Sequence, residues 1–254
     1  MNTYMKYTRQ LPQAEIEALA HLEEELFSPM VPHDEILQQL GMFLTTQNMC
    51  RILFMLEIYK RIIDVPGVIL DFGTRYGQNM ALFTTFRSIF EPYNFTRRVI
   101  GFDTFCGFPS VSNKDGTSAS IEQGNYSTAQ RGGGYGKRLA KLIRAHEAMT
   151  PLGHIAKSEV IEGDVCITFE KYLDAHPELI VSLAYFDMDL YEPTKFCLER
   201  TIKVMPKGAI LGFDELNHPS FPGETVAFKE CMAGKKIRLE RIPYASRPAF
   251  CVVE

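Results

Sequence analysis

The chain has 254 residues, of which 46% are hydrophobic and 23% are charged, and its formal net charge is −4. This length suits one α/β domain with a large core, or at most two small domains, and the charge gives no basic surface for nucleic acid or an anionic membrane. The apolar runs are far shorter than the ~20 residues that a membrane helix needs, and the N-terminus lacks a signal-peptide pattern. Six cysteines without a CxxC pair favour a reducing cytoplasm.

Two helical patterns open the chain. Residues 13–27 form an acidic amphipathic pattern, and residues 48–63 carry apolar side chains at helical spacing. We therefore predict an N-terminal helical cap over residues 1–66 and the main domain over residues 67–254. The apolar face of the cap, around Leu37, would pack on its own sheet or on another subunit.

Short apolar runs then alternate with helical patterns, which predicts a mostly parallel sheet with helices on both faces. The last two runs have no helix between them and predict an antiparallel edge. The polar stretch 104–136 is long for a connection, so it is either functional or disordered. The predicted strands are residues 68–72, 98–103, 158–162, 180–186, 209–213, 237–242 and 249–253, and the helices are residues 77–90, 137–149, 165–175, 192–204 and 222–231.

Acidic residues cluster after two of these strands. Asp187 and Asp189 follow the fourth strand, and Asp214 and Glu215 follow the fifth. Open α/β sheets bind ligands at this rim. Like charges held together are costly unless a cation or a shared proton relieves them, and a hard divalent cation is the simplest remedy. Glu192 we expect instead in the first turn of the next helix.

A second set of residues indicates a nucleoside ligand. A turn containing Gly73 and Gly77 follows the first strand, where glycine lets a ligand approach the backbone. Asp103 ends the second strand, where an acid commonly holds the ribose hydroxyls. Asp164 follows the third strand and would accept from an adenine amino group, cap the next helix, or do both.

These motifs resemble the S-adenosylmethionine-dependent, metal-dependent sugar O-methyltransferases typified by macrocin O-methyltransferase, which tailor antibiotic sugars. The resemblance covers roughly residues 68–228 and is carried by residues 101–109, 162–164 and 187–194. It implies a class I methyltransferase fold, which is a Rossmann-like sheet of seven strands with the last antiparallel. It also implies S-adenosyl-L-methionine as cofactor, Mg²⁺, a small-molecule sugar substrate and a homo-oligomer.

The resemblance implies roles for individual residues. Asp189, Asp214 and Glu215 match the metal ligands, and Asp187 matches the general base. The family usually has two aspartates after the fifth strand, so Glu215 departs from its pattern. The extra methylene of glutamate moves the carboxylate, and it stays open whether this enzyme works without a metal. The residues assigned to the cofactor are Gly73, Thr74, Gly77, Asn79, Asp103, Thr104, Phe105 and Asp164.

The expected reaction is direct methyl transfer to a sugar hydroxyl. Mg²⁺ would stabilise developing alkoxide character, Asp187 would take the proton, and in-line positioning would supply much of the rate. His218 would contact the substrate or act as an alternative base. Arg131, in a glycine-rich basic segment, would hold a diphosphate, and Tyr191 would contact the substrate, where it could supply an aromatic wall if the acceptor were aromatic.

Three alternatives remain open at this point. A catechol or phenol acceptor would use the same metal chemistry as a sugar hydroxyl. A nicotinamide-dependent dehydrogenase is disfavoured because the third glycine of its fingerprint is missing and the rim is acidic. A non-catalytic binding protein is disfavoured because clustered acids without a ligand are costly. The sequence distinguishes neither the sugar nor a nucleotide-sugar from a finished glycoside.

Overall fold

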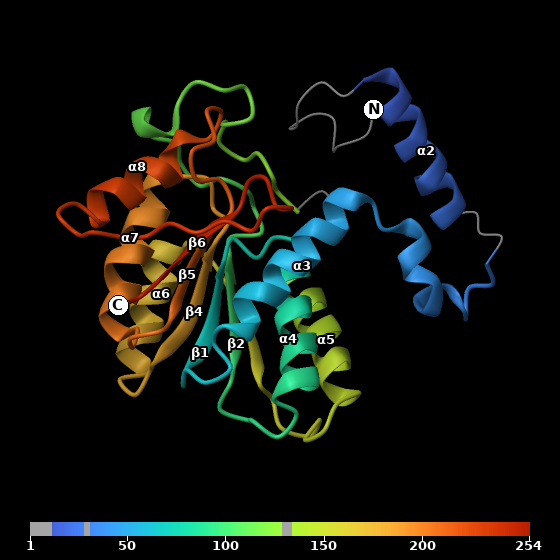
Figure 1. Ribbon diagram of the computed structural model, residues 1–254, viewed down its shortest axis with the longest axis horizontal. Coiled ribbons are helices and arrows are strands. Elements are labelled where there is room, and N and C mark those ends of the chain that lie inside the picture. The colour runs from blue at the N-terminus through green and yellow to red at the C-terminus, as the bar shows by residue number, and fades with distance from the viewer. Residues whose placement is uncertain (1–11, 28–30, 129–133) are drawn as a thin grey trace. The chain divides into compact units, whose positions relative to one another are not determined.

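The computed structural model describes residues 12–27, 31–128 and 134–254 (Figure 1). The chain divides into two compact units, Met1–Leu53 and Phe54–Glu254. The division at residue 66 stays a prediction. No helix among the described residues has the length and hydrophobicity that a membrane crossing requires.

The first unit contains α2 (Gln13–Phe27), as predicted, the 3-10 helix η1 (Ile36–Phe43) and the start of α3 (Thr46–Lys60). None of its described side chains is buried. Phe27, Leu37 and Met42 are among its exposed apolar residues. The described part of this unit therefore has no hydrophobic core of its own.

The second unit is built on one six-stranded sheet in the order β3-β2-β1-β4-β5-β6. All neighbouring strands are parallel except β5 and β6, which are antiparallel. The strand order reverses between β1 and β4, which is the switch point where such sheets bind ligands. The strands are β1 (Val68–Phe72), β2 (Val99–Asp103), β3 (Ser158–Glu162), β4 (Val181–Phe186), β5 (Ile210–Phe213) and β6 (Ala249–Val252).

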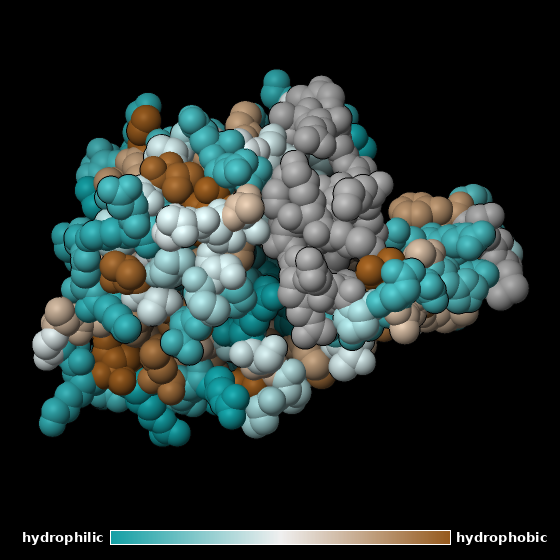
Figure 2. Space-filling model, turned by 90° about the horizontal axis from the view of Figure 1, so that it is seen from above, coloured by the Kyte–Doolittle hydropathy of each residue, from teal (hydrophilic) through white to brown (hydrophobic). Residues whose placement is uncertain are grey.

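Helices cover both faces of the sheet, with α4 and α5 on one face and α6, α7 and α8 on the other (Figure 1). In the view of Figure 2, small hydrophobic groups are interspersed among hydrophilic residues on the visible surface. The helices are α4 (Gln78–Phe90), α5 (Tyr135–Ala148), α6 (Val165–Ala175), α7 (Tyr191–Thr201) and α8 (Pro222–Cys231), with short 3-10 turns η2 (Asn113–Asp115) and η4 (Ile202–Val204).

The predicted strand over residues 237–242 is wrong. Its only sheet pairing within the described chain is one bridge, in which Glu240 and Phe250 exchange hydrogen bonds of 2.7 and 2.9 Å. The segment carries Arg238 and Arg241, which are both exposed. Charged side chains at a sheet edge discourage further pairing, so within the described residues the sheet has six strands instead of seven. The other predicted strands and helices agree with the structure to within about three residues.

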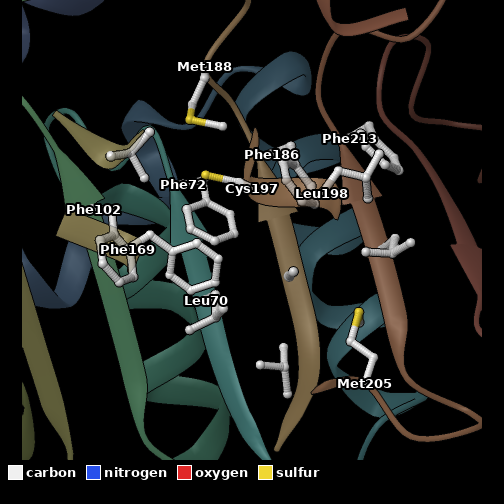
Figure 3. Packing of buried hydrophobic residues seen from close by; sticks show 14 of the residues in the cluster. Leu70, Phe72, Phe102, Phe169, Phe186, Met188, Cys197, Leu198, Met205 and Phe213 are labelled. Carbon is white, nitrogen blue, oxygen red and sulfur yellow. The ribbon is translucent and has the colours of Figure 1, made fainter. Parts of the chain in front are cut away.

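An aromatic row crosses the sheet near the carboxyl ends of its strands (Figure 3). Phe102, Phe72, Phe186 and Phe213 occupy matching positions on β2, β1, β4 and β5. Successive ring centroids are 5.4, 5.2 and 5.0 Å apart, and Phe169 of α6 packs on the first two rings. All five side chains are buried, so this row forms an apolar layer directly below the rim.

Candidate active site

Backbone hydrogen bonds extend the sheet by one residue beyond the aromatic row. In each, the residue that follows one strand donates its amide to a phenylalanine carbonyl on the neighbouring strand. Gly73, Asp187 and Asp214 donate in this way to Phe102, Phe72 and Phe186, at 2.9, 2.9 and 3.0 Å. The predicted cofactor turn and the acids after β4 and β5 therefore meet at one rim of the sheet.

The two glycines of the turn are needed for packing within the protein. Gly73 has φ +86°, and a Cβ there would lie 1.9 Å from the carbonyl oxygen of Asp187. Gly77 has φ +87°, and its Cβ would lie 2.2 Å from Leu139. Only glycine fits both the conformation and the space, so Gly73 joins the β1 turn to the end of β4.

Asp71 holds this turn together, and sequence analysis did not identify it. Its carboxylate is buried and accepts from Thr74 Oγ1 at 3.0 Å and Asn79 Nδ2 at 3.1 Å. Thr74 and Asn79, both predicted to bind the cofactor, thus point at least partly into the protein. An acid inside the apolar strand β1 was the available signal, because a buried carboxylate needs partners.

Asp103 lies where two turns meet. Its carboxylate accepts from the amide of Arg75 at 2.7 Å and from that of Phe105 at 2.6 Å. Burial raises the pKa of Asp103, and these two hydrogen bonds oppose the rise. Thr104 Oγ1 donates to the carbonyl of Gly107 at 2.7 Å and stabilises the second turn. The orientation of the Asp103 carboxylate is therefore fixed by the chain itself.

Asp189 is at the centre of the acid cluster. It has φ +62°, uncommon for a residue other than glycine. Burial raises its pKa well above the usual range, and the charges of Asp187, Glu215 and Asp214 raise it further. The other three carboxylates thus disfavour the charged form of Asp189, which favours binding of a cation or a proton there.

Asp214 and Glu215 each have a polar partner on the chain. Tyr185 donates its hydroxyl to Asp214 Oδ1 at 2.6 Å. Arg247, from the loop before β6, donates to Glu215 Oε1 at 3.1 Å. Both acids are buried. The longer glutamate side chain therefore has a cation of its own at this position.

Glu224 is a fifth acid of this region that sequence analysis did not identify. It is fully buried in the first turn of α8, and its Oε1 accepts from the Glu215 amide at 2.9 Å. Its Oε2 has no hydrogen-bond partner in the described chain. Burial raises the pKa of Glu224 well above its usual range, and the charge of Asp189 adds to this. In the sequence, an acid in the first turn of a helix is explained by its interaction with the helix dipole. The residues around Glu224 therefore gave no indication that it belongs to this region.

No three His, Cys, Asp or Glu side chains in the described residues are arranged as a ready metal site. The donor chemistry nevertheless suits Mg²⁺, because Asp189, Asp214 and Glu215 offer hard oxygens, and the neighbouring carboxylates disfavour the charged form of Asp189. Glu215 is the weaker candidate, since Arg247 already neutralises part of its charge.

His218 lies beside this cluster. Its Nδ1 is 3.8 Å from Glu215 Oε2 and accepts from the Ser220 amide at 3.3 Å. Burial lowers the pKa of His218, and the nearby Arg247 lowers it further. The accepting Nδ1 and the lowered pKa both favour the neutral imidazole. Asp164 caps α6 by accepting from the Cys166 amide at 2.9 Å, which is one of its two expected roles.

Tyr191 is tied to the long loop and to α8. Its hydroxyl lies 2.8 Å from Lys114 Nζ, 3.0 Å from Lys195 Nζ and 2.6 Å from Glu230. Its amide donates to Asp115 of the loop at 2.5 Å. These bonds direct its hydroxyl into a surface network rather than to the acid cluster. Arg131 lies outside the described residues.

The described part of the long loop, residues 104–128, is packed against other parts of the second unit. Phe108 and Ile121 of the loop form a small buried cluster with Leu190 and Phe221. A Cβ on Gly107 would lie 2.2 Å from the Asn125 carbonyl, which shows how tightly the loop folds on itself. Over this range the loop is ordered.

The strand order, the antiparallel edge and the acid-ended second strand together define a class I methyltransferase fold. No protein-family model and no curated protein sequence matches the chain. Solved protein structures, however, do match the chain. CalS11, a calicheamicin methyltransferase, is 36% identical over 99% of this chain and 96% of that chain, with a TM-score of 0.92.

An apo structure of CalS11, described as a TDP-rhamnose 3′-O-methyltransferase of calicheamicin biosynthesis, is 34% identical over 96% of each chain, with a TM-score of 0.83. The O-methyltransferase NovP, at 18% identity over 80% of this chain and 79% of that chain and a TM-score of 0.60, shares the fold. The chain belongs to the family of S-adenosylmethionine-dependent sugar O-methyltransferases of antibiotic biosynthesis.

Proposed function

We propose that this enzyme methylates a hydroxyl of a deoxysugar, presented as a nucleotide-sugar or a glycoside, in natural-product biosynthesis. The similarity to CalS11, which covers nearly the whole chain, carries this proposal. A catechol or phenol acceptor has no comparable support. The acids after β4 and β5 support this proposal, because they share one rim of the sheet with the turn that we assign to the cofactor.

In the proposed mechanism S-adenosylmethionine supplies the electrophilic methyl group. Asp103 holds the ribose hydroxyls, and Gly73, Thr74, Gly77, Asn79, Thr104, Phe105 and Asp164 shape the rest of the cofactor site. Asp187 takes the proton of the sugar hydroxyl as methyl transfer proceeds. The backbone amide of Asp187 donates a hydrogen bond to the carbonyl of Phe72, which fixes the backbone of the proposed base. This supports the role, because a base that is held in place needs less reorganisation during the reaction. His218, kept neutral by its surroundings, contacts the substrate or replaces the base.

Asp189, Asp214 and Glu215 are the proposed Mg²⁺ ligands. Bound there, Mg²⁺ would relieve the repulsion among the carboxylates and polarise the hydroxyl. Tyr191 is proposed to contact the substrate, and Arg131 is proposed to contact a diphosphate.

Two further proposals concern the protein's surroundings. The exposed apolar side chains of the first unit, such as Phe27 and Leu37, would be covered in a homo-oligomer. Light scattering on purified protein tests this. All six cysteines are free, which supports function in the reducing cytoplasm.

The first experiment is calorimetric titration with S-adenosylhomocysteine, with and without Mg²⁺. Asp103→Ala should weaken binding roughly 10- to 100-fold, since it removes charge-assisted hydrogen bonds. Asp174→Ala, at an exposed acid of α6, is the matched control. Methyl transfer to TDP-rhamnose is then compared with transfer to a catechol. Absence of S-adenosylhomocysteine binding would refute the cofactor assignment, and preference for catechol would refute the sugar assignment.

A further inference from the structure

Arg75 occupies the middle of the turn between β1 and α4, in the left-handed region with φ +46°. Its amide donates to the carboxylate of Asp103 at 2.7 Å. The backbone of Arg75 is therefore fixed against the residue that we assign to the ribose. A non-glycine residue in this conformation is uncommon and often marks a functional constraint.

Two tyrosine rings hold the guanidinium of Arg75. Its Cζ lies 4.8 Å from the ring centroid of Tyr76 and 4.9 Å from that of Tyr126, which belongs to the long loop. Its Nε is buried without a hydrogen-bond partner among the described residues. A guanidinium that stacks on aromatic faces keeps the N–H donors along its edge available for a planar anion.

The positive charge of Arg75 opposes the rise in the pKa of Asp103, so the guanidinium lies near that carboxylate. Yet Arg75 forms no ion pair with any residue that the structure describes. The guanidinium is thus near the acid that we assign to the ribose, and no carboxylate among the described residues is its ion-pair partner.

We propose that the guanidinium of Arg75, stacked on the rings of Tyr76 and Tyr126, binds an oxyanion of a ligand where the cofactor and acceptor sites meet. The oxyanion has two possible sources, namely the carboxylate of the cofactor's methionine part and the diphosphate of a nucleotide-sugar. This inference rests on the proposed function and adds a binding residue to it.

The test uses three ligands that separate these sources. S-adenosylhomocysteine carries the carboxylate, 5′-methylthioadenosine lacks it, and thymidine diphosphate carries only the diphosphate. Each is titrated calorimetrically into the wild type and into Arg75→Met and Arg75→Lys. Both replacements are unbranched at Cβ, so the strain at φ +46° is unchanged. Arg238→Met, at a highly exposed arginine, is the control for loss of one positive charge.

If the cofactor carboxylate is the ligand, Arg75→Met weakens S-adenosylhomocysteine binding roughly 10- to 100-fold and leaves 5′-methylthioadenosine unchanged. If the diphosphate is the ligand, only thymidine diphosphate binding weakens. Arg75→Lys should restore part of the loss, because it keeps the charge without the planar fork.

Two results would overturn the inference. Equal weakening of S-adenosylhomocysteine and 5′-methylthioadenosine would mean that Arg75 acts only through Asp103 or the fold. Unchanged binding of every ligand that the wild type binds would mean that Arg75 contacts none of them. Failure of the proposed function differs from both, because the wild type itself would then bind neither adenosine ligand.

Discussion

The amide of Asp187 donates to the carbonyl oxygen of Phe72 across 2.9 Å, so the acidic segment after β4 is fastened to the end of β1. Gly73, the next residue after Phe72, packs against the carbonyl of the same aspartate. The proposed base and the proposed cofactor turn are therefore joined by direct backbone contacts, and a change in either should affect the other.

Gly73→Ala should disturb this contact. The new Cβ would lie 1.9 Å from the Asp187 carbonyl, so the backbone must move and stability should fall by well over ~1 kcal/mol. Gly234→Ala is the matched control, because φ is +80° there and a Cβ meets nothing within 4 Å. Urea denaturation measures both variants. Equal losses would show that the close contact contributes nothing beyond backbone strain.

Asp187→Asn and Asp189→Asn should separate base from metal ligand. Asp187→Asn should lower kcat roughly 10²- to 10⁴-fold with little change in Mg²⁺ affinity, because an amide cannot accept the proton. Asp189→Asn should weaken Mg²⁺ binding, followed by calorimetry. If Mg²⁺ affinity falls with Asp187→Asn and not with Asp189→Asn, the two roles are exchanged.

Glu224 should matter through its bond to the Glu215 amide. Glu224→Ala removes the acceptor, leaves a buried N–H without a partner, and should cost about 1–3 kcal/mol of stability. Glu224→Gln keeps an acceptor oxygen and should cost less. Thermal unfolding compares the two, and a glutamine variant as unstable as the alanine variant would argue against this role.

The buried pair of Glu91 and Arg97 gives a prediction for pH. Arg97 Nε lies 3.0 Å from Glu91 Oε2. Burial opposes ionisation of Glu91, but bonds from Arg97 and Tyr59 prevail and lower its pKa below the ordinary 4.5. The folded state therefore binds the proton less readily than the unfolded state, and the stabilisation is complete above pH 4.5 and lost as pH falls through the folded pKa.

Glu91→Gln should accordingly cost about 3–5 kcal/mol at neutral pH, as expected when one partner of a buried pair is removed. The difference from wild type should shrink below pH 4.5. Glu159→Gln, in the partly exposed pair with Arg98, should cost at most ~1 kcal/mol. A difference between wild type and Glu91→Gln that stays constant down to pH 3 would contradict this account.

Local patterns predicted most of the fold because β1 and β4 are mostly apolar runs, the first followed by the turn at Gly73 and the second by Asp187. Because Asp187 and Asp214 directly follow neighbouring parallel strands, their position at one rim could also be predicted. Contacts between residues far apart in the sequence could not be predicted from local patterns. Glu224 turns inward only because α8 packs beside Glu215, and Tyr191 meets Lys114 across 77 positions of sequence. The segment 237–242 alternates like a strand, but its charged side chains limit pairing to one bridge.

The aromatic row also disfavours strand pairing in an incorrect register. Side chains alternate along a strand, so pairing β4 one residue out of step would move Phe186 out of the apolar layer and drive Asp187 into it. Burying that carboxylate without a partner would cost several kcal/mol, and β5 would face the same penalty with Asp214. A misregistered sheet is thus unstable as a whole, and a well-folded population should contain few molecules whose catalytic groups are out of place.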